Sequence, residues 1–298
     1  MSEDVEETVQ ETRATNQQDD EIRAYEEAQQ LELVRQERNR LLLQSTEPIF
    51  NALYKSYAYE VIAAVSRENR KRLGFQNVVT LSYAEASYTE LLKLLARLMR
   101  LGLSETFGGH FVDLGSGSGR MIFAAALYHD FLSVTGIEIL DDLYNITKKV
   151  LSEWDNIKDH LPAKKQDMAV KVQLGDCCYT DWSHADIVWC NATCFDTDIV
   201  EMIAQRAMLL KPGSFLLLVT KKLPSSVQYF FDEVDTAPVR LNWGEATVYY
   251  YRRNRVPDPT YIANKSEYVG SIIRRKALPV FDPRRAKLIP IDDKEAKS

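Results

Sequence analysis

The chain has 298 residues, of which 45% are hydrophobic, so it is long enough to bury a sizeable core in one large domain or two small ones. It opens with no signal peptide and has no apolar run of about 18 residues, so we expect neither a secreted protein nor a membrane span. The net charge is −6, but residues 1–45 hold 12 acidic and 5 basic residues whereas residues 252–298 hold 6 acidic and 12 basic ones. The two ends are therefore expected to meet different surfaces.

The first hundred residues predict a tail followed by a helical subdomain. Residues 1–20 are polar, acidic and rich in Gln, a composition typical of disorder. Over residues 21–101 we expect a helical N-terminal subdomain that includes a loop. The expected helices cover 21–44, 49–65 and 87–101, and the extended loop covers 78–85. The string Ser45-Thr46-Glu47-Pro48 is expected to interrupt the first helix, because Ser, Thr and Pro favour helix starts.

An alternation of strands and helices then predicts an α/β domain over residues 102–252. The expected strands are 109–114, 133–138, 169–174, 187–190, 214–220, 230–235 and 246–251, the last two forming an antiparallel pair. The expected helices are 121–128, 141–154 and 198–209. This rhythm is typical of a doubly wound, Rossmann-like sheet, here with seven strands. Residues 253–298 are basic and contain five prolines, which predicts a tail without regular structure.

A glycine-rich turn follows the first strand of this domain. Asp113 is followed by Gly115, Ser116, Gly117 and Gly119, directly before a helical segment. Only glycine lets a backbone approach a ligand this closely at a strand-to-helix turn. The spacing differs from the Gly-x-Gly-x-x-Gly dinucleotide pattern and favours S-adenosylmethionine, whose ammonium group the acid before the glycines can bind. If this glycine-rich segment is considered alone, a tight strand-to-helix turn that binds no ligand is the alternative interpretation.

Polar side chains recur where the parallel strands end. Glu138 ends the second strand, where a carboxylate can hold the hydroxyls of a ribose. Asp176 and Cys177 follow the third strand, where the acid can accept from an adenine amino group, and Asn191 follows the fourth. Because ligands bind at the carboxyl ends of parallel strands, these residues predict one cofactor site together with the glycine turn. Each acid alone is more commonly a turn or cap residue.

The four cysteines lie in the second half of the domain, at positions 177, 178, 190 and 194. Their spacing lacks the His pair of a zinc site, so we expect no metal. They are interpreted as small apolar side chains of a reduced intracellular protein.

Over residues 45–252 the chain resembles the Dot1-type protein lysine methyltransferases, whose catalytic domain has the class I S-adenosylmethionine-dependent methyltransferase fold. The resemblance rests on four strings in a fixed order, Tyr83-Ala84-Glu85, the Asp113–Gly119 turn, Asn191-Ala192-Thr193-Cys194-Phe195, and Trp243-Gly244-Glu245-Ala246-Thr247-Val248-Tyr249-Tyr250. Ala84 stands where the family usually has glycine, and the third string is similar to a protist and algal branch of the family.

The resemblance implies roles for the residues of these strings. Tyr83 and Glu85 would cover the methionine end of S-adenosylmethionine, and Asn191 would line the methyl-transfer site. Phe195 and Tyr250 would form the lysine channel, and Tyr250 is identified by its position seven residues after Trp243. For both Tyr250 and Trp243, a place in the core of a strand is the alternative.

The resemblance also implies the substrate and the partners. A lysine of a histone in a nucleosome is favoured, which favours the nucleus over the cytoplasm. A lysine of another protein, a small-molecule substrate, and a cofactor-binding scaffold that acts through the N-terminal helix are the alternatives. The basic tail, including Arg274-Arg275-Lys276 and Arg284-Arg285, is a sparse candidate for DNA contact. The oligomeric state is left open.

Overall fold

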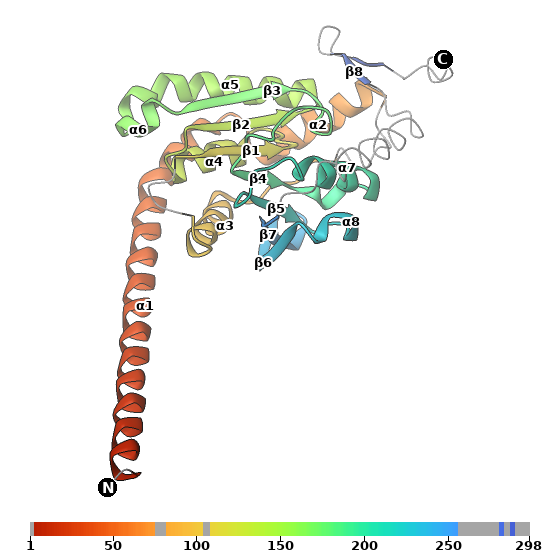
Figure 1. Cartoon of the computed structure of the whole chain (residues 1–298). Helices are drawn as coiled ribbons and strands as arrows, with labels where there is room; N and C mark the ends of the chain where they lie inside the picture. Colours follow the sequence, from red (N-terminus) through yellow and green to blue (C-terminus); the bar gives the residue numbers. More distant parts are fainter. Residues whose placement is uncertain (1–2, 75–81, 104–107, 256–279, 283–286, 290–298) are drawn as a thin grey trace. The chain divides into compact units, whose positions relative to one another are not determined.

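The computed structural model describes the backbone of residues 3–74, 82–103, 108–255, 280–282 and 287–289, and the side chains of those between 21 and 255. The chain divides into two compact units, Met1–Thr46 and Glu47–Ser298. The first unit consists of the greater part of helix α1 (Glu3–Leu53). The second unit contains the sheet, which dominates the fold (Figure 1).

Helix α1 is continuous where the sequence predicts a disordered tail and then a break. Residues 1–47 contain neither Gly nor Pro and are rich in Glu, Gln, Ala and Leu, which favour helix. At the expected break, the hydroxyls of Ser45 and Thr46 donate to the Leu42 carbonyl at 3.0 and 2.6 Å instead of capping a new helix. Pro48 lies inside the helix.

The seven-stranded, Rossmann-like sheet predicted from the sequence is confirmed. Its order is β3-β2-β1-β4-β5-β7-β6. The strands are β1 (His110–Leu114), β2 (Ser133–Glu138), β3 (Ala169–Leu174), β4 (Ile187–Cys190), β5 (Phe215–Val219), β6 (Phe231–Leu241) and β7 (Gly244–Arg253). Strands β1 to β5 are parallel, whereas β7 runs antiparallel between β5 and β6.

The register brings the carboxyl ends of the central strands to the same edge. Leu114 in β1 pairs with Ile137 in β2 and with Cys190 in β4. The chain leaves β1 toward β2 on one side and returns as β4 on the other, so the strand order reverses at β1. A doubly wound sheet binds ligands at such a reversal, beyond the carboxyl ends of the strands.

The helices of the second unit flank the sheet (Figure 1). They are α2 (Tyr59–Arg72), α3 (Tyr88–Arg100), α4 (Arg120–Tyr128), α5 (Asp141–Ile157), α6 (Ala163–Gln166), α7 (Thr197–Ala207) and α8 (Ser225–Gln228). Helix α3 begins where the Ser87 side chain accepts from the Glu90 N–H, and its leucines are buried as the sequence predicts. Helix α2 packs on α5, and α3 packs on α4 and β6. Helices α2 and α3 lie in the same compact unit as the sheet, whereas residues 1–46 form the other unit.

A short hairpin lies within the C-terminal segment, for which the sequence predicts no regular structure. Strands β8 (Val280–Asp282) and β9 (Lys287–Ile289) pair antiparallel. The prolines at positions 279, 283 and 290 flank the paired residues, so no backbone donor of the ladder is lost.

Candidate active site

The turn from β1 into α4 is as tight as its glycines predict. Gly115, Gly117 and Gly119 have φ angles of 74°, 56° and 83°, a region that L-residues with side chains rarely adopt. A Cβ on Gly119 would lie 2.6 Å from Thr147 Cγ2, so this glycine permits close packing of α4 against α5. Glycine thus lets the turn adopt these angles without strain and permits the close contact at Gly119.

A cavity of about 250 Å³ lies beside this turn at the carboxyl ends of the strands. The predicted cofactor-binding residues that line it are Tyr83, Glu85, Asp113, Gly115, Ser116, Gly117, Glu138, Asp176, Cys177 and Asn191. Gly119 does not line the cavity, because it packs against α5 instead. Residues 82–86, which we call the covering loop, contribute to the wall; residues 78–81 of the loop predicted over 78–85 lie outside the described residues.

Two buried carboxyl groups lie in this cavity. Asp113 and Glu138 are 3% and 5% exposed. Burial raises the pKa of both groups, and the Glu138 charge raises the pKa of Asp113 further. Glu138 accepts from the Gly117 and Leu140 N–H groups at 2.6 and 2.8 Å, which fixes its carboxylate. A ligand that carries positive charge and hydroxyl groups would stabilise these buried acids, so the donor set fits S-adenosylmethionine.

The covering loop is held to the glycine turn by a short polar chain. The Tyr83 hydroxyl and Ser118 Oγ lie 2.7 Å apart, and Ser118 Oγ donates to Glu85 Oε1 at 3.2 Å. Glu85 also pairs with Arg120 Nε at 2.9 Å. Ala84, which replaces the usual glycine of this loop, has no positive φ angle, so the loop does not need glycine at that position.

Asn242, which the sequence analysis missed, ties the same loop to the turn between β6 and β7. Glu85 N–H donates to Asn242 Oδ1 and Asn242 N–H donates to the Glu85 carbonyl, each at 2.9 Å. Asn242 Nδ2 donates to the Tyr59 hydroxyl, and Ala86 forms a bridge with Leu241. The only sequence signal was an Asn beside Trp243-Gly244, which indicates a turn but not its partner.

Asn191 lies at the end of β4, where a chain of hydroxyl groups orients its amide. Asn191 Oδ1 accepts from Thr193 Oγ1 at 2.8 Å, and Thr193 Oγ1 lies 3.0 Å from Thr220 Oγ1. Thr220 has a φ of 69°, which is strained for a β-branched residue. These bonds orient the Asn191 amide with its carbonyl oxygen toward Thr193. Thr220 was not predicted, because nothing at the end of β5 marks it.

Of the two aromatic residues predicted to form the lysine channel, Phe195 lines the cavity and Tyr250 does not. Phe195 lines the cavity, and its Cζ lies 3.5 Å from where a Gly115 Cβ would be. Tyr250 does not line the cavity; it is fully buried and its hydroxyl donates to the Leu94 carbonyl of α3 at 3.2 Å. Trp243 is 50% exposed in the hairpin turn and does not line the cavity either. The channel role expected for Tyr250 is therefore corrected.

The pleat of β7 explains this correction. Alternate residues of a strand face opposite sides of the sheet, so Tyr250 faces α3 while its neighbour Tyr249 faces the other side. Tyr249 is half-buried and packs on the same apolar cluster as Phe195 and Ile199. Its ring lies 4.9 Å from Lys222 Nζ. The residue seven positions after Trp243 is Tyr250. It lies on the opposite face of β7 from Tyr249, which packs on the same apolar cluster as Phe195.

The fold and the site define the class of S-adenosylmethionine-dependent class I methyltransferases. Residues 61–249, more than half of the chain, match the family described as histone methylation protein DOT1. The chain belongs to the DOT1 family and is a Dot1-like S-adenosylmethionine-dependent methyltransferase.

The chain is also similar in part to solved structures, two among others. An RNA methyltransferase from Salinibacter ruber in complex with S-adenosyl-L-homocysteine is 23% identical, with 56% of this chain and 94% of that chain covered and a TM-score of 0.41. TrmN from Thermus thermophilus is 15% identical, with 55% of this chain and 48% of that chain covered and a TM-score of 0.41. No curated protein matches the chain. Within the described residues, no helix combines the length and apolarity needed to cross a membrane.

Proposed function

We propose that this protein methylates the ε-amino group of a histone lysine in a nucleosome. The observation that carries the proposal is the cavity with its two buried acids, Asp113 and Glu138, and with Phe195 in its wall. The choice of a histone lysine as the target is implied by membership of the DOT1 family. S-adenosylmethionine, when bound, supplies a methyl group attached to a cationic sulfur.

Different residues of the cavity wall would bind different parts of the cofactor. Asp113 would bind the methionine ammonium by charge and hydrogen bond, and Glu138 would accept from the ribose hydroxyls. Asp176 would accept from the adenine amino group. Tyr83 and Glu85 would close the methionine end, since the loop that carries them is bonded to the glycine turn. The NH₂ group of Asn191 would donate to the methionine carboxylate or orient the incoming amine.

The target amine must lose its proton before it can react, because an ammonium has no lone pair. Free lysine has a pKa of about 10.4, so at neutral pH under about one amine in a thousand is unprotonated. A dry aromatic channel lowers that pKa by disfavouring the charged form. We assign the channel walls to Phe195 and Tyr249, which pack on one apolar cluster, in place of Tyr250.

The basic C-terminal segment fits a nucleosomal substrate. Residues 252–298 hold six more basic than acidic residues, so we propose that they contact DNA phosphates and that this contact weakens as salt rises. A nuclear location follows from this substrate. The acidic segment 1–45 would be repelled by DNA and is available for another partner.

The test is methyl transfer from a labelled cofactor to intact nucleosomes, free histone octamers and a whole-cell lysate. Label on a lysine of a nucleosomal histone supports the proposal. Label confined to non-histone proteins would replace the histone by another protein substrate. The matched control is Asp113→Ala, which should abolish both labelling and binding of S-adenosylhomocysteine. Wild-type protein without heat of binding for that compound would overturn the assignment of the cavity.

A further inference from the structure

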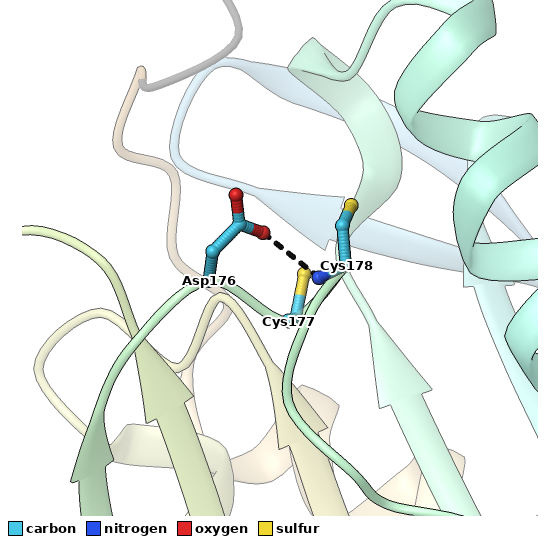
Figure 2. Close-up of side chains that lie close together, drawn as sticks. All are labelled: Asp176, Cys177 and Cys178. Carbon is cyan, nitrogen blue, oxygen red and sulfur yellow. Dashed lines mark hydrogen bonds between the residues drawn. The ribbon is translucent and has the colours of Figure 1, made fainter. Parts of the chain in front are cut away.

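A cluster of metal-ligating side chains lies on the wall of the cavity, where the sequence analysis expects no metal. Asp176, Cys177 and Cys178 follow β3, and their side chains point to the same side of the turn (Figure 2). One ligand atom from each, a carboxylate oxygen or a sulfur, lies within 4.8 Å of the other two. All three residues also line the cavity.

The backbone of this turn is fixed on both sides of the two thiols. Asp176 Oδ1 accepts from the Cys178 N–H at 2.8 Å. Trp182 Nε1 donates to the Cys177 carbonyl at 2.9 Å, and Arg206 Nε donates to the Cys178 carbonyl. Partners thus hold the backbone of the turn, while the Asp176 carboxylate and both sulfur atoms point to the same side of it. Such anchoring holds ligands in place before a metal arrives.

The chemistry of the three groups favours a soft cation. Cys177 and Cys178 are free thiols, 9% and 6% exposed. The pKa of Cys178 is raised well above its usual range, first by a hydrogen bond with the Cys177 thiol and then by burial. Thiols bind such a cation as thiolates, so binding displaces their protons. Two sulfur ligands and one carboxylate are a donor set that zinc and related ions accept.

The size of the cluster suits such an ion. Zinc binds sulfur at about 2.3 Å and carboxylate oxygen at about 2.0–2.2 Å, so tetrahedral ligands lie roughly 3.3–3.8 Å apart. A shift of about 1 Å by side chains closes the present separation to that range. Three protein ligands leave the fourth position open to the cavity, as in zinc sites that bind a further molecule.

We propose that Asp176, Cys177 and Cys178 bind a thiophilic divalent cation, and that this cation and the methyl donor exclude one another from the cavity. Binding replaces two S–H bonds by two metal–sulfur bonds and releases two protons to solvent. The cation would occupy the wall that we assign to the adenine amino group. The mutual exclusion rests on the proposed function of the cavity, whereas cation binding does not.

The test is titration of the full-length, metal-free protein with Cd²⁺, followed by the ultraviolet charge-transfer band of sulfur bound to cadmium. We expect saturation at one equivalent, with release of two protons into a weakly buffered solution. Cys177→Ser and Cys178→Ser should each weaken binding at least about tenfold, and Asp176→Asn about tenfold. Cys194→Ser is the matched control, because this thiol also lines the cavity but lies outside the cluster.

The proposal would be overturned if cadmium produced no charge-transfer band. It would also be overturned if Cys177→Ser and Cys178→Ser bound cadmium as tightly as the wild type. Cys177→Ala and Cys178→Ala, compared by thermal melting without metal, separate lost ligands from lost folding. Exclusion is tested by titrating S-adenosylhomocysteine with and without Cd²⁺, and equal affinities would refute it. A metal-free protein that does not bind S-adenosylhomocysteine would refute the proposed function instead, without affecting the cadmium result.

Discussion

The Tyr83 ring lies against the α-carbon of Gly117, so that a Cβ on Gly117 would come within 2.7 Å of Tyr83 Cε2. Gly117→Ala must therefore move the covering loop and also hold alanine at a φ of 56°. We expect S-adenosylhomocysteine to bind at least about tenfold more weakly in calorimetry, and the strained φ alone to cost about 1–2 kcal/mol of stability.

A double-mutant cycle separates the clash from the backbone strain. In the Tyr83→Ala background the ring is gone, so Gly117→Ala should cost only the strain of its φ angle. Thermal melts of the four proteins check this, since 1 kcal/mol shifts the midpoint by roughly 2–4 °C in a domain of this size. Strictly additive effects of the two substitutions would contradict the contact.

Asp113→Asn should stabilise the ligand-free protein while it abolishes cofactor binding. The pKa of Asp113 is raised in the folded state, so the free energy of unfolding decreases as pH rises above the usual pKa of an aspartate and is regained as pH falls. Removing the charge should raise the midpoint of unfolding by roughly 2–4 °C per kcal/mol gained. Asp155→Asn, an exposed acid on α5, is the control that should change neither quantity. A less stable Asp113→Asn protein would contradict this prediction.

Cofactor affinity should rise with pH in mild acid. Burial raises the pKa of both Asp113 and Glu138, so these carboxyls bind protons in the ligand-free protein at a pH where free carboxyls are ionised. A cationic ligand prefers the carboxylates, so binding releases protons and weakens as pH falls, by up to about tenfold per pH unit for each proton released. Calorimetry between about pH 5 and 7.5 measures the slope, and Glu138→Gln should reduce it. A cofactor affinity that does not change with pH would contradict contact between these two acids and the charged ligand.

Tyr249 and Tyr250 should behave oppositely in turnover and stability. Tyr249→Ala should lower kcat at least about tenfold and spare binding of S-adenosylhomocysteine, because the channel loses a wall but the cofactor keeps its partners. Tyr250→Phe should spare kcat and cost about 1 kcal/mol, because it loses the hydrogen bond to the Leu94 carbonyl. Nucleosome methylation rates and thermal melts distinguish the two. Loss of turnover in Tyr250→Phe with a normal melt would restore the original assignment.

The predictable parts of this molecule are local in sequence. Buried runs, the glycines after Asp113 and the acids at strand ends each lie within a few residues of the feature they define, so the sheet and its candidate cofactor residues were found. Tyr250 was misassigned because the face of β7 is set by its pairing with β5, as in the pair Leu217 and Tyr250. Asn242 was missed because its partner Glu85 lies 157 residues away. The break expected at Pro48 failed because Ser45 and Thr46 bond backward along α1.

The attachment of Asn242 to the covering loop has a mechanical consequence. Glu85 is hydrogen-bonded at both its N–H and its carbonyl to Asn242, in the turn of the hairpin that carries Tyr249, so the loop cannot lift without disturbing that hairpin. Opening of the covering loop should therefore be coupled to movement of the hairpin, so that neither segment moves alone.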